Sequence, residues 1–298
     1  PRMLSLFPLE DEEENQNPET GEPTAFARRD EPPLPPVTRP AAAEPDLADG
    51  RDELNLAEFP LTLLSDRPAP GVEKLTFSDT VYDSGDGGRP VTRTLTVAPA
   101  VGLGLPTPAD GDVLLALIQL TRWKNGFANR AVEFSRYEVV KLLRWPDSGA
   151  SYERIEQSLN RWMGVLLLYD RAWWDKTQKA WVNEKFHVLD RVSVRSTRQG
   201  RSSFTWGEVP FNSFRSENVK KLDLGLYFDL KHPSTRRLYR FLDKRFHQRD
   251  AVSFDLRTLA CEHVGFSREY ANAELKRKFL PAVEELEAAG YVEPAPTD

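Results

Sequence analysis

Two short strings in this sequence place the strongest constraint on its fold. The chain reads AVEFS at Ala131–Ser135 and AVSFD at Ala251–Asp255, 120 residues later. In each string, alternating apolar residues predict a short strand, and the final Ser or Asp is a residue type that caps helix N-termini. The same offset aligns Ile155 with Leu275. Both residues lie in a predicted helix further along the chain, and the alignment needs no gap between the string and that helix. The chain is therefore predicted to contain one fold twice.

The residues around the first string follow the element order of a winged helix. DVLLALIQLTRW has apolar residues at three- and four-residue spacing, which predicts a helix. After the strand AVEF, Ser135 caps a helix that stops at Pro146, and SYERIEQSLNRWM predicts a third helix. VLLLYDRAWW and AWVNEKFHVLDRVSVRS then predict a hairpin, joined by the turn DKTQK, that would form the wing. Helix, strand, two helices and a hairpin is the order of a winged helix-turn-helix domain.

The second string lies in a similar order of elements. HPSTRRLYRFLDKRFHQR predicts a helix, AVSF a strand, and LRTLACEHV a helix capped by Asp255. SREYANAELKRKFLPAVEELEAAG predicts a long third helix with a kink at Pro281, and GYVEP begins a final strand. The predicted fold class is α+β, with two tandem winged-helix domains.

The N-terminal residues have a different composition. Residues 1–53 are rich in Pro and Glu and poor in aromatic side chains, so they are predicted to be a disordered acidic tail. LNLAEFPLTLL, Leu54–Leu64, is an apolar segment expected to dock onto the folded body. Residues 74–99 alternate around the turn DSGDGG, which predicts a β-hairpin. The predicted domains are therefore 54–203, which includes this hairpin, and 204–298.

Charge is distributed unevenly along the chain. The formal net charge is −6, but residues 1–58 hold 5 Lys/Arg against 15 Asp/Glu, whereas residues 121–280 hold 31 against 19. Because charges act over about 8–10 Å at physiological ionic strength, the basic body can attract an anionic partner. A single Cys fits a reducing, cytoplasmic setting, and no apolar run is long enough for a membrane span.

The third helix of each copy is expected to present its outward face to the DNA major groove. Arg can bind guanine edges or phosphates, and Gln can pair with adenine. The predicted DNA-binding side chains are Ser151, Tyr152, Arg154, Gln157 and Arg161 in the first copy, and Arg268, Tyr270, Asn272, Lys276, Arg277 and Lys278 in the second. For any one of these residues, a solvated helix face is an equally good interpretation.

Two further basic groups extend this predicted surface. The predicted wing carries Arg171, Lys176 and Lys179. The run RVSVRSTRQGR, with Arg195, Arg198 and Arg201, is interpreted as a basic linker between the domains that contacts phosphates. A solvated connection is the alternative for the linker. The adjacent Trp173 and Trp174 are expected to point to opposite faces of a strand, in the core or against a partner.

No motif in the sequence indicates catalysis, a metal or a cofactor. The four His residues show no metal-ligand spacing, there is no phosphate-binding loop followed by Lys-Ser/Thr, and no G-x-S-x-G is present. Cys261 lies in a predicted helix and is interpreted as a core residue. The protein is therefore predicted to be a non-enzymatic binding protein.

Three segments resemble the plasmid replication initiator protein A family: GLPTPADGDVLLALIQL, FDLKHPSTRRLYRFLDKRF and ELKRKFLPAVEELEAAGYV. The resemblance runs from about Leu54 to Val292. It implies a sequence-specific DNA-binding initiator that binds repeats at a plasmid origin, helps to open the duplex and recruits the host initiator and replicative helicase. It also implies that the protein can form homodimers and repress its own promoter.

Three other hypotheses stay open at this point. A winged-helix transcriptional regulator would bind DNA without a role in replication. A nickase or primase would need catalytic His or Tyr residues. A structural scaffold would not bind DNA at all.

Overall fold

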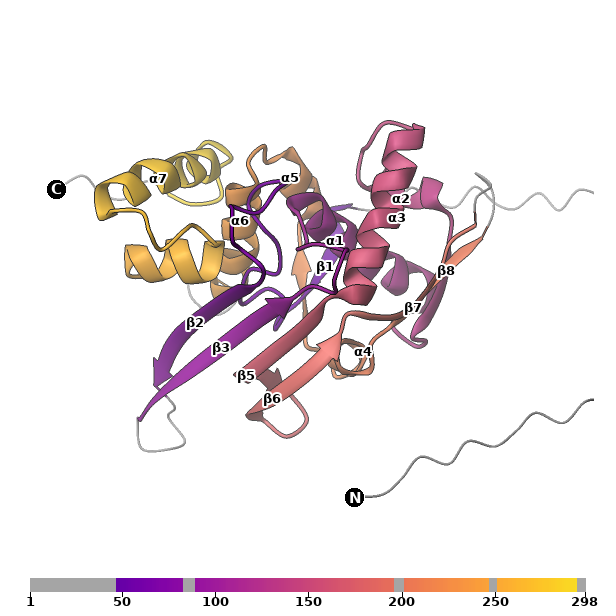
Figure 1. Cartoon of the computed structure of the whole chain (residues 1–298), viewed down its shortest axis with the longest axis horizontal. Coiled ribbons are helices and arrows are strands. Elements are labelled where there is room, and N and C mark those ends of the chain that lie inside the picture. The colour runs from indigo at the N-terminus through magenta and orange to yellow at the C-terminus, as the bar shows by residue number, and fades with distance from the viewer. Residues whose placement is uncertain (1–46, 83–88, 196–200, 247–250, 294–298) are drawn as a thin grey trace, which may run out of the picture. The chain divides into compact units, whose positions relative to one another are not determined.

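The helix α1 (Pro108–Asn125) lies at the centre of the described part of the chain. In the computed structural model, which describes residues 47–82, 89–195, 201–246 and 251–293, every α1 residue from Asp110 to Thr121 is buried. A helix that is apolar on nearly all sides is stable only when other elements surround it. The sequence predicted one buried face, and the structure buries the whole central part of α1. The described residues all belong to one compact unit (Figure 1).

The helices of the described residues differ widely in length. They are η1 (Leu47–Asp49), α1, α2 (Arg136–Leu142), α3 (Gly149–Gly164), α4 (Glu208–Arg215), α5 (Leu224–Asp229), α6 (Pro233–Phe246), η2 (Thr258–Val264) and α7 (Asn272–Ala288). η1 is a 3-10 helix and η2 is a π-helix. No helix among these combines the length and the apolar character that a membrane span requires.

The strands form three antiparallel sheets. The strands are β1 (Gly50–Glu53), β2 (Leu75–Tyr82), β3 (Pro90–Ala98), β4 (Ala131–Phe134), β5 (Leu166–Asp175), β6 (Ala180–His187), β7 (Leu189–Ser193), β8 (Ser202–Trp206) and β9 (Val219–Leu222). Their order is β2-β3-β5-β6 in the largest sheet, β4-β8-β7 in the second, and β1-β9 in the smallest.

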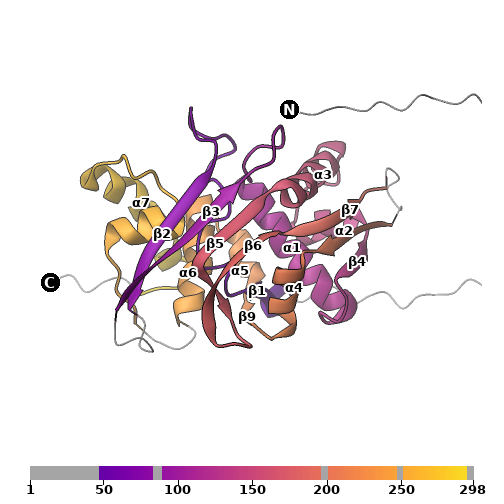
Figure 2. The same ribbon diagram turned by 60° about the horizontal axis from the view of Figure 1, so that its bottom comes forward.

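The four-stranded sheet joins two hairpins that are distant in the sequence. The predicted hairpin over residues 74–99 is confirmed as β2 and β3, with Phe77 opposite Leu95. The predicted hairpin over 165–196 is confirmed only up to His187, as β5 and β6, because residues 189–193 form β7 of another sheet. β5 also pairs with β3, so the two hairpins form one sheet. Helices α1, α5 and α6 lie behind this sheet in Figure 2. This packing explains why Leu95, Val97 and Leu167 are buried.

The local predictions around the first string are confirmed. AVEF forms β4, and Ser135 caps α2, since its side chain accepts a hydrogen bond from the Glu138 backbone N–H. α3 follows, with Ile155, Leu159 and Trp162 buried. These features depend on residues close together in the sequence, which explains why the sequence predicted them.

The structure differs from the prediction around the second string. AVSF, residues 251–254, is not a strand, and Tyr291–Glu293 show none of the predicted final strand. A short strand needs a neighbour for its backbone hydrogen bonds. β4 obtains this neighbour from β8, whereas no described strand pairs with residues 251–254. The segment after Asp255 forms the π-helix η2, and α7 continues through Pro281.

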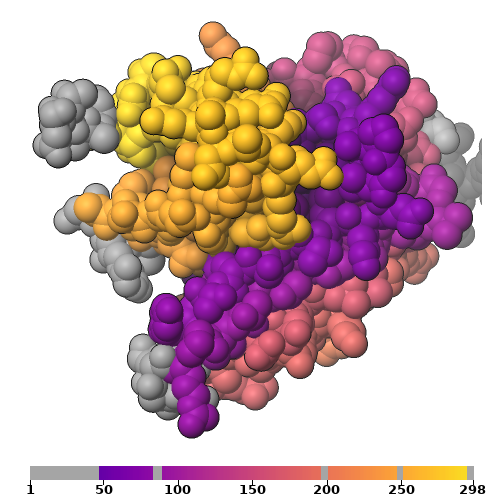
Figure 3. Space-filling model, turned by 60° about the vertical axis from the view of Figure 1, so that its left-hand side comes forward, coloured from indigo at the N-terminus to yellow at the C-terminus, as the bar shows by residue number. Residues whose placement is uncertain are grey.

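The predicted boundaries of the tail and of the domains also need correction. Residues 47–53, assigned to the disordered tail, form η1 and β1, and β1 pairs with β9. The boundary at 203/204 falls inside β8. One hydrophobic core contains residues from both predicted domains. Figure 3 shows the C-terminal residues packed against the β2–β3 region, where Arg268 donates a 2.8 Å hydrogen bond to the Thr76 carbonyl. Residues 1–46 lie outside the described residues.

Candidate nucleic-acid interface

The start of α3 carries the first group of predicted DNA-binding residues. The Ser148 side chain caps the helix and accepts a hydrogen bond from the Ser151 backbone N–H. Ser151 is only 8% exposed and its hydroxyl lies 3.2 Å from that of Ser148. The Tyr152 hydroxyl donates a 2.6 Å hydrogen bond to Asp147, and the Arg136 guanidinium lies over the Tyr152 ring. Ser151 is therefore engaged in the helix cap and Tyr152 is half-buried, and the phosphate contacts predicted for them stay predictions.

Arg154 and Gln157 form the exposed part of the α3 face. Both side chains are exposed. The Arg154 guanidinium lies 5.5 Å from the centroid of the Trp145 ring, and the Gln157 amide donates a 3.1 Å hydrogen bond to Glu153. A cation held over an aromatic ring and an amide bound to a neighbouring carboxylate are both partly oriented before any ligand arrives. These two residues are the best placed of the five on α3 to contact DNA.

Arg161 lies two turns beyond Arg154 on the same side of α3, at the end of the helix that contacts α1. Its guanidinium donates hydrogen bonds of 3.0 and 3.1 Å to the two carboxylate oxygens of Asp110, and one of 3.2 Å to the Leu103 carbonyl. Asp110 is fully buried and also accepts a hydrogen bond from the Thr107 backbone N–H at the start of α1. Arg161 therefore joins α3 to α1. The helical position alone did not reveal that α1 covers this end of α3.

The β5–β6 hairpin carries the three residues that the sequence placed on the wing, with Arg171 in β5 and Lys176 and Lys179 in the turn. Lys176 donates a 2.9 Å hydrogen bond to the Glu217 carbonyl, and Arg171 and Lys179 have positive φ values of 50° and 52°. β5 starts directly after α3 and extends for 10 residues. At about 3.3 Å per residue, the turn lies roughly 30 Å from the end of α3. These residues are exposed, but they do not border the α3 face.

The predicted linker is instead part of the second sheet. Residues 189–193 and 202–206 are the strands β7 and β8, and β8 pairs with β4. Arg195, just after β7, and Arg201, just before β8, are exposed. The Arg201 Nη1 atom lies 3.6 Å from the Oε2 atom of Glu133 on β4. Arg198 lies outside the described residues. The interpretation of this run as a linker is wrong, because the run begins in β7 and ends next to β8, and these two strands pair as one hairpin.

Four of the predicted residues of the second copy, Asn272, Lys276, Arg277 and Lys278, lie on α7. Arg268 and Tyr270 precede it, because the helix begins at Asn272 and not at Ser267 as predicted. Lys276, Arg277 and Lys278 are exposed, and the Lys278 ammonium lies 4.8 Å from the centroid of the Tyr270 ring. Lys278 also lies 3.8 Å from Glu274. α7 and α3 lie well apart in both ribbon views (Figures 1 and 2). The exposed cations of α7 therefore form a surface separate from that of α3.

Two other predicted residues near α7 are engaged within the fold. The Asn272 amide oxygen accepts hydrogen bonds of 2.6 and 3.1 Å from Arg257. The Arg268 guanidinium binds Glu262 and the Thr76 carbonyl, while Glu262 also accepts a 2.8 Å hydrogen bond from the Ser78 backbone N–H. Arg268 and Glu262 thus cover backbone groups at the edge of β2, which would otherwise be open to pairing with another strand.

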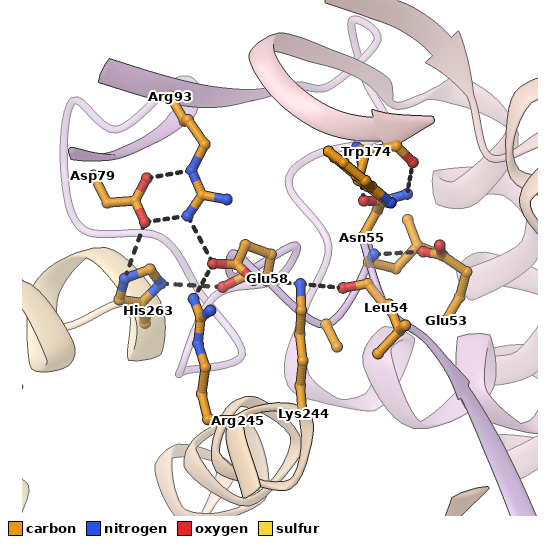
Figure 4. Close-up of polar contacts among 12 residues, drawn as sticks. Glu53, Leu54, Asn55, Glu58, Asp79, Arg93, Trp174, Lys244, Arg245 and His263 are labelled. Atoms are coloured by element: carbon orange, nitrogen blue, oxygen red, sulfur yellow. Dashed lines mark hydrogen bonds and ion pairs between the residues drawn. The ribbon is translucent and has the colours of Figure 1, made fainter. Parts of the chain in front are cut away.

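The sequence analysis missed a buried polar network centred on Glu58 (Figure 4). Glu58 is 1% exposed and binds Arg93, Lys244 and Arg245. Burial alone would raise the pKa of Glu58, but the combined charge of Lys244, Arg245 and Arg93 holds that pKa well below its usual value. A charged group is tolerated in the core only when it is paired in this way. No local signal predicts this network, since the partners lie 35 to 187 residues from Glu58.

The same network contains three groups with the chemistry of metal ligands. Ligand atoms of Glu58, Asp79 and His263 lie within 4.8 Å of one another. Arg93 donates a 2.9 Å hydrogen bond to Asp79 and another to Glu58. Burial lowers the pKa of His263, which keeps its ring neutral at pH 7. Guanidinium and ammonium groups already supply the positive charge that a metal ion would bring, so this cluster fits an internal salt-bridge network better than a metal site.

The comparison with known families shows to which family this chain belongs. The family model described as replication initiator protein A matches residues 51–287. The chain belongs to the replication initiator protein A family. The match begins in β1 and ends in α7, so it covers both candidate DNA-binding helices. The family resemblance in the sequence is therefore confirmed.

Two solved structures resemble this replication initiator protein A chain. A crystal structure of domains 2 and 3 of RctB, from selenomethionine derivatives, has a TM-score of 0.51 at 15% identity and covers 78% of this chain and 85% of that chain. A second crystal structure of RctB domains 2–3 has a TM-score of 0.44 at 16% identity, with 73% and 80% covered. The first likeness shows a shared mixed α/β fold. No curated protein sequence matches the chain.

Proposed function

We propose that this protein initiates plasmid replication by binding double-stranded DNA at repeated sequences of the plasmid origin. Membership of the replication initiator protein A family supports a role in DNA replication and contact with DNA. The exposure of Arg154 and Gln157 on α3, beside a hairpin with exposed Arg195 and Arg201, carries the proposal for the first DNA contact. These side chains suit base edges and phosphates.

The first DNA-binding module in this proposal is a winged helix made of α1, β4, α2, α3, β7 and β8. The sheet order β4-β8-β7 supports it, because the strand between the first two helices then pairs with the hairpin after α3. The wing is then the β7–β8 hairpin rather than β5–β6. α3 is the helix that enters the major groove.

The second module in this proposal is centred on α7. α6, η2 and α7 supply the three helices, and Lys276 and Arg277 supply exposed cations. Its wing is not among the described residues. We propose that both modules bind DNA, which lets one chain span adjoining turns of an origin repeat.

Several further features follow from the initiator role. We propose that the protein acts in the bacterial cytoplasm on plasmid DNA, promotes duplex opening, and recruits the host initiator and replicative helicase. We also propose that it can form homodimers, and that it acts through binding rather than catalysis. A winged-helix transcriptional regulator is the alternative, since the same surface would serve a promoter.

Footprinting and gel-shift titration on the DNA that flanks the gene test this function. We expect protection of direct repeats, affinity that falls steeply with salt because phosphate contacts release counterions, and maintenance of a plasmid that carries these repeats. Protection of a single promoter palindrome, with no plasmid maintenance, would favour the regulator. Retention on no DNA at low salt would exclude both.

The α7 surface is tested separately with Arg277→Ala. We expect a loss of about 1–3 kcal/mol in specific binding if Arg277 reaches a base, and a smaller, sequence-independent loss if it binds phosphate. Arg257→Ala is a control near α7, since Arg257 binds Asn272 within the fold. Unchanged affinity for Arg277→Ala and Lys276→Ala together would remove α7 from the interface.

A further inference from the structure

The helix α7 buries one side against α6 and leaves its other side open at one end of the described unit (Figures 1 and 2). A row of exposed residues runs along the middle of this open side, and we call it the α7 stripe. The stripe consists of Ala273, Arg277, Leu280, Glu284 and Ala288. At 3.6 residues per turn, these five residues lie within about 80° of the helix circumference, so all of them can face one partner.

The two charged residues of the α7 stripe have no opposite charge to pair with. Neither Arg277 nor Glu284 forms an ion pair with another of the described residues. They lie seven residues apart, which is about 10 Å along the helix axis and too far for a pair within α7. Glu274, three residues before Arg277, instead lies 3.8 Å from Lys278. Both charges of the stripe are therefore available to a partner.

The order of residues along the α7 stripe is complementary to itself. When two copies of α7 are placed antiparallel about a two-fold axis between Leu280 and Pro281, Arg277 of each copy faces Glu284 of the other. Leu280, which is 43% exposed, then meets Leu280 and Pro281 of the other copy at the centre. Ala273 faces Ala288 at both ends, where small side chains let two helix axes approach to about 8–10 Å. One arrangement thus pairs both charges and covers the exposed leucine.

We propose that the α7 stripe is a contact surface for a second copy of this chain, formed by two antiparallel α7 helices. The proposal rests on the homodimer of the proposed function and names a surface for it. One pair of helices buries less than the roughly 1,200 Å² of a standard interface, so the contact is weak and forms where chains are concentrated, as on neighbouring repeats of one DNA. Because Arg277 is also a proposed DNA contact, α7 binds either DNA or the second copy.

Charge reversal tests the contact in sedimentation velocity experiments on the full chain, without DNA, at concentrations up to about 100 µM. Arg277→Glu and Glu284→Arg should each weaken self-association at least about tenfold, because both ion pairs become repulsive. An equimolar mixture of the two variants should associate as the parent chain does, since every carboxylate then faces a guanidinium. The double variant should associate for the same reason. Lys221→Glu makes the same change of charge on the exposed side of β9 and should have no effect.

Disulfide formation reports this contact separately from any other surface that joins two chains. Leu280→Cys places two thiols next to the two-fold axis, so mild oxidation should link the chains, whereas Lys221→Cys should not link them. The native Cys261 is buried and does not interfere. Single charge variants that associate like the parent chain, a mixture that does not associate, or no disulfide at position 280 would overturn the proposal. DNA is absent from both assays, so a failure of the proposed DNA binding leaves these outcomes unchanged.

Discussion

The guanidinium of Arg240 donates two hydrogen bonds of 2.8 Å to the two carboxylate oxygens of Asp52, which lies 188 residues earlier in the chain. Asp52 is fully buried and Arg240 is 6% exposed. Burial opposes the charge on both groups, but their mutual attraction lowers the pKa of Asp52 below its usual value. This salt bridge connects β1 to α6.

We expect Asp52→Asn to lower the free energy of unfolding by about 3–5 kcal/mol, because it leaves the buried charge of Arg240 without a partner. Urea denaturation followed by tryptophan fluorescence measures this loss. Arg51→Ala is the matched control next along the chain, since Arg51 pairs with the half-exposed Asp49 and should cost less than about 1 kcal/mol. Equal losses of unfolding free energy for the two variants would show that the buried pair contributes no more to stability than the half-exposed pair.

Two truncations test the corrected N-terminal boundary. Removing residues 1–53 deletes β1 with Asp52 and Glu53, whereas removing residues 1–46 leaves both in place. Glu53 accepts hydrogen bonds of 2.6 and 2.8 Å from Ser213 and Asn218, which the longer truncation also breaks. We therefore expect the longer truncation to unfold at lower urea or to be insoluble, relative to the shorter one.

The shorter truncation should bind DNA as tightly as the full chain, or slightly more tightly, because residues 1–46 carry far more acidic than basic side chains. Gel-shift titration compares the two. Weaker binding after loss of residues 1–46 would show that this segment contributes directly to DNA recognition.

Arg154 and Arg161 lie two turns apart on α3 and should respond differently to alanine. Arg154→Ala should weaken specific DNA binding by about 1–3 kcal/mol and leave stability nearly unchanged, because its side chain is exposed. Arg161→Ala should instead lower stability by about 3–5 kcal/mol, since it leaves the buried Asp110 carboxylate unpaired. Urea denaturation and gel shift on both variants separate the effects. The reverse result would mean that the roles of Arg154 and Arg161 are assigned wrongly.

Stability should decrease as the pH falls from 7 to 5, in part through His263. Burial lowers the pKa of His263 from 6.5, although Glu58 and Asp79 oppose the shift. His263 in the unfolded chain then binds a proton near pH 6.5, whereas His263 in the folded chain is still neutral at that pH. Protonation therefore favours the unfolded state and lowers the free energy of unfolding. The substitution His263→Phe removes the group that binds this proton. An aromatic ring suits the site, because the His263 ring stacks on Phe59 and Phe241.

Urea midpoints at pH 7, 6 and 5 measure the change for both proteins. The variant should lose less stability over this range than the parent chain. An identical pH dependence would mean that His263 has the same pKa in the folded and unfolded states.

Local sequence patterns predicted those parts of the structure whose contacts are short in range. The Ser135 cap and the buried face of α3 depend on neighbours within a few residues, and capping rules and periodicity describe such neighbours well. The alternation in AVEF predicted β4, but the strand also needs β8 as its partner. The exposed cations Arg154 and Arg277 were also found in this way. The family resemblance rests on three other segments, which form α1, α6 and α7.

The sequence by itself determined the central helix, the strand and cap at the first string, the two hairpins and the candidate helix faces, because each follows from the period and end signals of one segment. Only the tertiary structure decided that β8 pairs with β4, that Arg161 belongs to the α1 contact, and that the polar strand β1 is buried. These outcomes depend on charged and backbone groups meeting partners 50 or more residues away, as Arg161 meets Asp110. Sequence patterns assign a polar residue to the surface, because its burial depends on an opposite charge that only the fold brings close to it.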